Sequence, residues 1–357
     1  MHFTSTLAFS AALFAAPAWS WGVEGHKTVA TIAQIHLLPS ARRAIRDILP
    51  DKYNGSLAGI ATWPDEVRNE TQWKWSKELH FVNGKNDKPP KNCLFGEQGW
   101  ESDMNVLNGI VNMTRIITNS TGEQQDFALR FLTHFLGDVH QPLHLTGHYW
   151  GANNVPVLYE GNHRRLHSVW DDDLIEYRIR TLTNYTTALP TSPAPSLSPS
   201  TLLRNKHIES ALTGSNYDPL VRWIVLEGIY GWWAGELNEW TTCPQLDVQR
   251  QGEGQKTMQN LPYEDPLDVP VCPYHWSAPS HQMVCDFIWR SDFEGVKNWT
   301  EAVFQIELEP EYGSLIRDKK TIEKQLALGG MRLAATLNTV LGSEEEMTMF
   351  GAMPRVF

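Results

Sequence analysis

The chain has 357 residues, of which 41% are hydrophobic, and a formal net charge of −11 at pH 7. After residue 20, no stretch reaches the ~18 uninterrupted apolar residues of a membrane span, so the sequence predicts no membrane protein. Because the net charge is negative, the protein as a whole repels a polyanion, so a nucleic-acid substrate would need a local positive field.

The first 20 residues are predicted to be a signal peptide. The apolar run LAFSAALFAAPA is too short to span a bilayer, and AWS at 18–20 is a small-x-small cleavage signal. Cleavage would make Trp21 the first residue of the mature protein. We expect residues 21–341 to form one domain and residues 342–357 to form a flexible tail.

Helical periodicity dominates the mature chain. Apolar residues recur with the spacing of an amphipathic helix within 21–49, 103–117, 126–139, 220–240 and 320–341. The third of these helices should end near Pro142, because proline cannot continue a helix. The pattern predicts a mainly α fold.

Two other segments depart from this helical pattern. Residues 151–167, GANNVPVLYEGNHRRLH, are the best candidate for a short β-hairpin. Residues 181–202 are rich in proline, serine and threonine, and such a composition predicts an exposed loop. The fold class is therefore a single compact helical domain with a short β-hairpin.

Cysteines and glycosylation sequons indicate an oxidising compartment. The four cysteines allow three pairings. Residues 243–272 are a polar excursion between two cysteines, so a Cys243–Cys272 bridge would close a local loop, and the remaining pair, Cys93–Cys285, would tie the front half to the back. With the leader, the N-x-S/T sequons predict a secreted glycoprotein. They stand at Asn54, Asn69, Asn112, Asn119, Asn184 and Asn298.

Histidines and aspartates interrupt apolar segments at several places. HFLGDVHQPLH contains His134, Asp138 and His144, and LHSVWD contains His167 and Asp171. On a helix, each His-x-x-x-Asp pair presents a nitrogen and an oxygen from one face, and this ligand combination suits zinc. A single such pair is equally typical of a helical salt bridge. Two copies favour a metal site, and the remaining polar candidates are His26, Asp65 and His80.

These segments resemble the zinc-dependent S-one/P-one type nucleases of fungi and plants, which cut single-stranded DNA and RNA and remove 3′-phosphates. The resemblance covers nearly the whole mature chain, and the segments occur in the family's order. They are WGVEGH, WPDEVR, ELHF, THFLGDVHQPLH, GAN, LHSVWD, CDFIW and EKQLALGGMRLAATLN. The resemblance implies that residues 21–341 are a catalytic nuclease domain with the fold of zinc phospholipase C and the P-one nuclease.

The resemblance also implies three zinc ions per chain, with ligands that can be named in this sequence. The first zinc would take Asp65, His80, His134 and Asp138; the second would take His26, Asp138 and the amino group and carbonyl of Trp21; the third would take His144, His167 and Asp171. Asp138 would bridge the first two ions. A hydroxide between them would attack phosphorus and leave products with 5′-phosphates.

Further residues are implied to act on the substrate. Asp65 would orient the attacking water, and Arg68 would offset charge on the scissile phosphate. Phe81 would stack on an unpaired base, which favours single strands. Asn83 and Asn153 would also bind substrate, although the family often has aspartate at the first position and GGN where this chain has GAN.

Two alternatives remain at this point. Zinc phospholipases C share the trinuclear arrangement and a mature N-terminal tryptophan, so a lipid phosphodiesterase is the nearest rival. A non-catalytic secreted glycoprotein of the same fold would be expected to lack some of the ligands, yet every position is filled. We therefore expect a secreted, monomeric nuclease whose substrates are single-stranded nucleic acid and 3′-nucleotides.

Overall fold

The computed structural model describes residues 21–244, 266, 268–296, 302, 304–307 and 310–352. Within these ranges the chain is mainly helical, with one two-stranded antiparallel sheet. The helices are α1 Val23–Ile35, α2 Pro39–Ile48, α3 Trp63–Val67, α4 Val106–Asn119, α5 Glu123–Asp138, α6 Leu166–Ser168, α7 Leu174–Thr181, α8 Pro199–Ala211, α9 Asp218–Trp223, α10 Leu237–Thr241, α11 Pro273–Met283, α12 Leu315–Asp318, α13 Thr321–Leu341 and α14 Glu344–Phe350. The strands are β1 Pro156–Tyr159 and β2 Asn162–Arg165.

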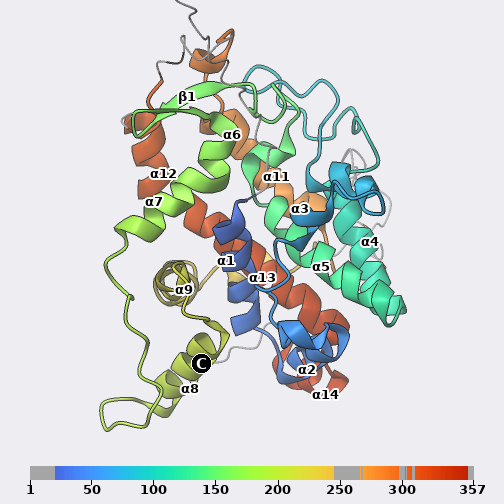
Figure 1. Cartoon of the computed structure of the whole chain (residues 1–357), viewed down its shortest axis with the longest axis vertical. Coiled ribbons are helices and arrows are strands. Elements are labelled where there is room, and N and C mark those ends of the chain that lie inside the picture. The colour runs from blue at the N-terminus through green and yellow to red at the C-terminus, as the bar shows by residue number, and fades with distance from the viewer. Residues whose placement is uncertain are drawn as a thin grey trace, which may run out of the picture.

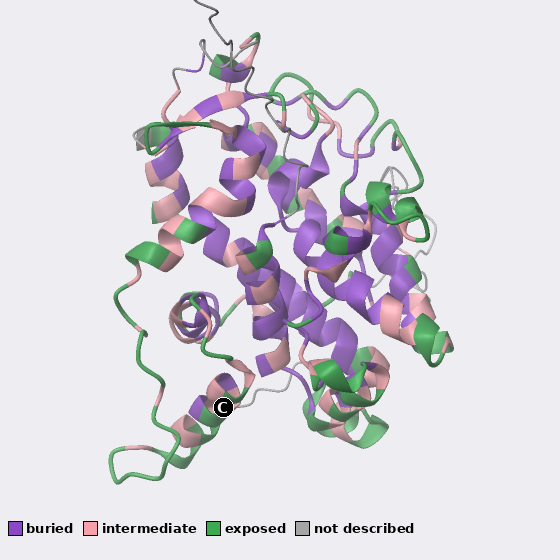
Figure 2. Ribbon diagram, in the orientation of Figure 1, coloured by how far each residue is buried: buried purple, intermediate pink, exposed green. Residues whose placement is uncertain are grey.

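Helix α13 runs through the middle of the molecule and packs against α1 (Figure 1). It is buried along nearly its whole length, as the colouring of the central helices in Figure 2 shows. Two glycines allow the close approach. A Cβ atom on Gly330 would lie 2.5 Å from the Ile32 side chain of α1, and one on Gly329 would lie 3.1 Å from the Leu136 carbonyl of α5. The three helices therefore form a tightly packed centre.

Helix α5 carries a large part of the hydrophobic core. Phe131, Leu132, Phe135 and Leu136 are fully buried, and α4 packs beside this helix. The α-helix ends at Asp138, four residues before Pro142, which begins a short 3₁₀ helix, η3 Pro142–Leu145. This agrees with the boundary expected from proline.

The predicted hairpin is confirmed. Pro156 pairs with Arg165, and Tyr159 pairs with Asn162. The turn residues Glu160 and Gly161 both have positive φ, of 47° and 74°, as a two-residue turn with the twist of the strands requires.

The segment predicted as a helix over 220–240 is interrupted. It begins as α9, continues as a wider π-helical stretch, η5 Ile224–Trp232, and resumes as α10. The Trp233 amide donates to the Gly228 carbonyl at 2.9 Å, and a Cβ atom on Gly228 would lie 2.5 Å from the Trp233 ring. Glycine thus gives the bulky ring room to fold back, which breaks the helix.

The proline-rich loop is exposed over most of its length but shorter than expected. Residues 199–202 form the first turn of α8, with Pro199 at the first helical position and the Ser198 hydroxyl accepting from the Thr201 amide. Proline is favoured at that position because the helix needs no amide donor there. The proline, serine and threonine content of these residues had predicted a loop.

The tail after Gly342 contains the helix α14. Its Glu346 carboxylate accepts hydrogen bonds from the amide and hydroxyl of Ser40, at 2.9 and 2.7 Å, which ties α14 to the start of α2. A flexible tail was expected from residue 342 onward, and the first part of it is helical instead. Residues 353–357 lie outside the described ranges.

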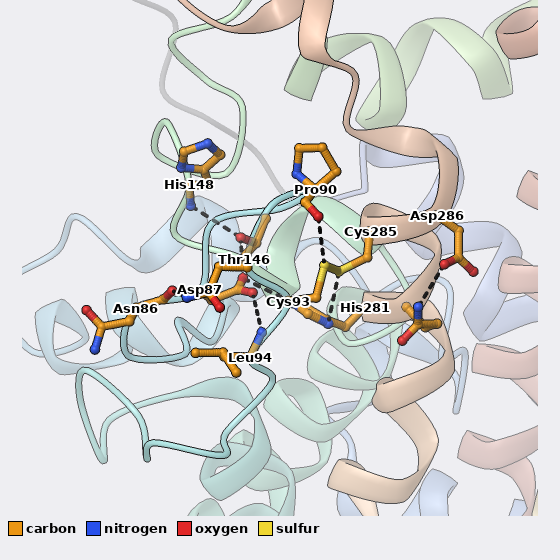
Figure 3. Close-up of a disulfide and its surroundings, with 12 residues drawn as sticks. Asn86, Asp87, Pro90, Cys93, Leu94, Thr146, His148, His281, Cys285 and Asp286 are labelled. Atoms are coloured by element: carbon orange, nitrogen blue, oxygen red, sulfur yellow. Dashed lines mark hydrogen bonds and ion pairs between the residues drawn. A yellow bond between two sulfur atoms is a disulfide. The ribbon is translucent and has the colours of Figure 1, made fainter.

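Both disulfides pair as the sequence predicts. The Cα atoms are 6.1 Å apart in Cys93–Cys285 and 5.6 Å apart in Cys243–Cys272, and Figure 3 shows the former with its surroundings. The predicted leader, most of the 243–272 excursion and Asn298 fall outside the described residues. The other five sequon asparagines are exposed. In the described part of the chain, none of the helices has the length and apolar character to span a membrane.

A buried histidine at the end of α1 predicts how stability depends on pH. His36 donates from Nδ1 to the Ile32 carbonyl at 2.7 Å and accepts at Nε2 from the Tyr230 hydroxyl at 2.8 Å. Burial lowers the pKa of His36 to about 4. Between pH ~6.5 and 4 the unfolded chain therefore binds a proton here that the folded chain does not, so stability falls as the pH falls.

We expect this residue to contribute about 3 kcal/mol to the loss of unfolding free energy across that window. The measurement is urea unfolding of metal-free protein at several pH values, for the native chain and His36→Gln. The native chain should lose stability more steeply below pH ~6.5. Parallel pH profiles would show that His36 is not the group responsible.

Candidate metal centre

Three groups of buried histidine and aspartate side chains lie close enough to hold metal ions. In each group, one nitrogen or oxygen of every residue lies within 4.8 Å of the others. The structure thus brings together all eight side chains that the sequence proposed as ligands. The groups are His26–His134–Asp138, Asp65–His80–His134 and His144–His167–Asp171.

The Asp138 carboxylate lies at the centre of the site. It is the last residue of α5, one helical turn after His134, so both point from the same face of the helix. Four imidazoles surround it, at 3.1 Å for His80 Nδ1, 3.3 Å for His134 Nε2, 3.4 Å for His26 Nε2 and 3.6 Å for His144 Nδ1. A single carboxylate therefore contacts histidines from all three groups.

Three of the histidines are oriented by backbone carbonyls. A carbonyl can only accept a hydrogen bond, so the Nδ1 atom that contacts it carries the proton. This leaves Nε2 unprotonated and directed into the site, the arrangement typical of metal-binding histidines. The acceptors are Ala61 for His134 (2.7 Å), His80 for His144 (2.9 Å) and Gly151 for His167.

The third group lies where η3 meets the start of α6. His167 in α6 and Asp171 in the π-helical stretch η4 Val169–Asp173 are four residues apart, with Nε2 and Oδ2 3.3 Å from each other. The Gln141 amide donates to Asp171 Oδ1 at 2.6 Å, and the Gly22 amide donates to the Asp171 carbonyl. Gln141 lies within the HFLGDVHQPLH segment but was not among the residues predicted for the site.

A left-handed helical turn supports this group. The φ angles are 48° at Tyr149, 59° at Trp150, 59° at Gly151 and 65° at Ala152. Left-handed backbone costs roughly 1–2 kcal/mol for each residue other than glycine, so surrounding contacts must maintain the turn. Its carbonyl at Gly151 is the acceptor that orients His167. The alanine of GAN thus adopts a conformation that glycine would take without strain.

The bonding of Asp138 and His80 fits a metal ion. Among the described residues, neither Asp138 oxygen nor His80 Nε2 has a hydrogen-bond partner of normal geometry, and all three atoms are buried. Buried polar atoms without such partners are rare in folded proteins, because each one costs desolvation energy. A bound divalent cation would complete their coordination.

The charge states of Asp138 and of two histidines beside it suit the same role. Burial raises the pKa of Asp138, but the adjacent His134, His26 and His80 outweigh it and hold that pKa well below its usual range. Burial lowers the pKa of His134 to about 3 and that of His144 to about 4. Neutral imidazoles beside an ionised carboxylate are the protonation states that metal ligands require. Asp171 differs, because burial raises its pKa well above the usual range, so a metal ion bound there would displace a proton from it.

Trp21 lies just before α1, and the candidate ligand His26 lies in the first turns of that helix. Trp21 is fully buried, and the His26 ring stacks on His134 with their centroids 3.8 Å apart. The His26 ring lies against Gly137, where an added Cβ atom would be 2.6 Å from Nδ1. The glycine of HFLGD therefore provides the space that His26 occupies.

Gly137→Ala is expected to displace His26 and to weaken metal binding by about 10- to 100-fold, as loss of supporting contacts around a ligand does. If His26 stayed in place, the backbone of α5 would have to move instead to make room for the added methyl group. Metal content after dialysis at fixed free metal concentration measures the effect. Gly235→Ala is the matched control, because nothing lies within 4 Å of its added Cβ atom and its φ lies outside the left-handed region. An unaltered metal content in Gly137→Ala would contradict the packing role.

Arg68 and Phe81 lie at the edge of the first two groups. Arg68 Nη1 is 3.2 Å from Asp65 Oδ1, and its side chain is 12% exposed, so it pairs with a candidate ligand rather than with a distant surface charge. Phe81 directly follows His80 and is 38% exposed. An exposed ring beside a buried ligand is available to stack on a flat partner.

The two asparagines are more constrained. Asn83 donates to Glu101 at 3.3 Å and packs on Gly147. Asn153 donates from Nδ2 to the Trp150 carbonyl, which braces the left-handed turn, and its Oδ1 is buried with no hydrogen-bond partner among the described residues. His140 lies in the same segment as His134 and His144 but belongs to none of the three groups; it is hydrogen-bonded to the Leu136 carbonyl and to Arg332.

Comparison with known proteins supports a nuclease. A family model described as S1/P1 Nuclease matches residues 21–215. "Nuclease PA3" from Penicillium sp is 31% identical over 91% of this chain and 99% of its own length, and "Nuclease P1" from Penicillium citrinum is 29% identical over the same shares. "Nuclease S1" from Aspergillus oryzae is 35% identical over 44% of this chain and 55% of its own length. The chain therefore belongs to the S1/P1 nuclease family, as its resemblance to the S-one/P-one type nucleases predicted, and it is a metal-dependent enzyme that hydrolyses phosphodiester bonds.

Proposed function

We propose that the chain is a secreted, trinuclear zinc endonuclease. It hydrolyses single-stranded DNA and RNA to products with 5′-phosphates and also acts as a 3′-nucleotidase. The observation that carries the proposal is the Asp138 carboxylate surrounded by four imidazoles, with two further carboxylates in the adjoining groups. Histidine nitrogen with carboxylate oxygen is the ligand set that zinc prefers when no thiolate is present.

The ligand assignment follows the three groups, with Asp138 shared. We assign Asp65, His80, His134 and Asp138 to the first zinc, His26, Asp138 and the amino group and carbonyl of Trp21 to the second, and His144, His167 and Asp171 to the third. Zinc at these positions would lower the pKa of water toward neutrality and would offset the negative charge of a phosphate. This supplies the local positive field that an acidic protein lacks.

Side chains of the chain itself position the substrate. Asp65 accepts a hydrogen bond from the attacking water and orients it. The Arg68 guanidinium, 3.2 Å from Asp65, donates to phosphate oxygens and stabilises charge that develops in the transition state. Asn153 binds a phosphate oxygen through its amide, and Asn83 contacts the base.

Phe81 selects single strands. A base can stack on its exposed ring only after leaving the stack of a duplex, and such stacking contributes roughly 1–3 kcal/mol with little dependence on base identity. We propose that this makes the enzyme tolerant of sequence. We further propose that the mature protein is a glycosylated monomer that begins at Trp21.

The experiment compares three substrates with one preparation of mature protein. We expect single-stranded DNA to be cleaved much faster than duplex DNA, and phosphatidylcholine not to be cleaved. EDTA should abolish the activity, and added zinc should restore it. Preferred cleavage of phosphatidylcholine would favour the phospholipase alternative, and full activity in excess chelator would refute a metal mechanism. A protein that cleaves none of the three would support the non-catalytic alternative.

A further inference from the structure

Asp87 is a buried carboxylate that belongs to none of the three metal-binding groups. It lies in the loop that leads to Cys93, and only 6% of it is exposed. Its Oδ2 atom accepts from the Thr146 hydroxyl at 2.6 Å and lies 3.1 Å from His281 Nε2, while Oδ1 accepts from the Leu94 amide at 3.0 Å (Figure 3). One carboxylate thus joins its own loop to two segments that are distant in sequence, at Thr146 and His281.

Thr146 connects Asp87 to the third metal-binding group. It follows the ligand His144 by two residues, and its hydroxyl oxygen also accepts from the His148 amide at 3.3 Å. The left-handed turn of residues 149–152 comes next, and its Gly151 carbonyl orients His167. Asp87 therefore holds the start of segment 146–152. The ligand His144 comes just before this segment, and the carbonyl that orients the ligand His167 lies near its end.

The opposite side of this segment is also held. His148 Nε2 lies 3.0 Å from Glu294 Oε1, and Trp289 Nε1 donates to the same oxygen at 3.1 Å. The Cys93–Cys285 disulfide links the Asp87 loop to η6 Val284–Ile288, which directly follows α11 and its His281. These contacts maintain a backbone conformation that is locally unfavourable.

We propose that Asp87 is a positioning residue for the third metal-binding group. Through Thr146 it fixes the backbone just after His144 and the start of the segment whose Gly151 carbonyl orients His167. This inference rests on the proposed function, because it requires that the group binds zinc. Partners in the second layer around metal ligands typically change metal affinity by about 10- to 100-fold when they are removed.

The test uses Asp87→Asn and Thr146→Val. The first variant keeps the shape of the side chain and loses its charge and one acceptor oxygen; the second removes the donor and leaves Asp87 and His281 intact. Zinc-free protein is titrated in competition with a chromophoric chelator. Both variants should bind one of the three zincs about 10- to 100-fold more weakly and the other two as the native chain does.

Asp286→Asn is the matched control. This carboxylate lies near the same disulfide, is exposed and accepts a hydrogen bond from Gln282 at 2.7 Å, and we expect native affinity at all sites. The melting temperature of each zinc-free protein measures general destabilisation separately.

The outcomes separate this inference from the proposed function. A native chain that fails to bind three zincs refutes the proposed function. Three zincs in the native chain, with unchanged affinities in both variants, overturn the role of Asp87 alone. Equal weakening of all three sites overturns it as well, because that pattern indicates general unfolding. If Asp87→Asn does not fold, Thr146→Val decides the question, since it removes the same hydrogen bond.

Discussion

Asp138→Asn is expected to reduce the hydrolysis rate of single-stranded DNA by about 10³-fold or more while the protein remains folded. Removing one group that stabilises a transition state commonly costs about 10²- to 10³-fold, and Asp138 serves two of the proposed zincs. An amide in its place has lost the negative charge and one of the oxygens that meet the imidazoles of His26, His80 and His134. The measurement is kcat together with zinc content.

Arg68→Ala is the comparison for this prediction. Arg68 pairs with Asp65 but is not itself a proposed ligand, so its removal should leave the zinc content unchanged and should cost about 10²-fold in kcat. Equal losses of activity in the two variants, with native zinc content in both, would show that Asp138 does not bridge two ions.

A single extra residue before Trp21 is expected to remove the second zinc and to lower activity by about 10²-fold. The extension converts the α-amine into an amide, which is no longer a donor of an unshared electron pair to a metal. Trp21 cannot shift easily, because its side chain is fully buried and the Gly22 amide donates to the Asp171 carbonyl at 2.9 Å.

The preparations for this test need verified N-termini. Protein that begins at Trp21 should contain close to three zincs, and protein with one alanine added should contain close to two. Melting temperatures of the two zinc-free proteins should agree, which separates metal loss from misfolding. Native activity in the extended protein would refute the role of the amino group as a metal ligand.

Local sequence pattern predicted most of the fold and the two His-x-x-x-Asp pairs, whereas the resemblance to the nuclease family supplied the assignment of ligands to individual metal ions. The apolar spacing of α5 predicted a helix over 126–139, and the structure has it over Glu123–Asp138. Within that helix the four-residue spacing placed His134 and Asp138 on one face. The hairpin was predictable because its turn residues and alternating strand residues lie next to one another in the chain.

Features that depend on long-range packing were beyond the sequence. The break after η5 arises because the Trp233 ring fills the space over Gly228, and the spacing of apolar residues does not reveal this. The left-handed turn at 149–152 contains three residues that disfavour it, so local propensity argues against the observed conformation. Asp87 contacts Thr146, which lies 59 positions further along the chain, and no local motif indicates this contact.

Zinc content of the purified mature protein tests the central claim most directly, since the account depends on side chains from distant parts of the chain gathering around metal ions. Elemental analysis after dialysis against metal-free buffer should find close to three zincs per chain. A chain that begins at Trp21, is folded and cleaves single-stranded DNA, yet holds no zinc, would contradict the account.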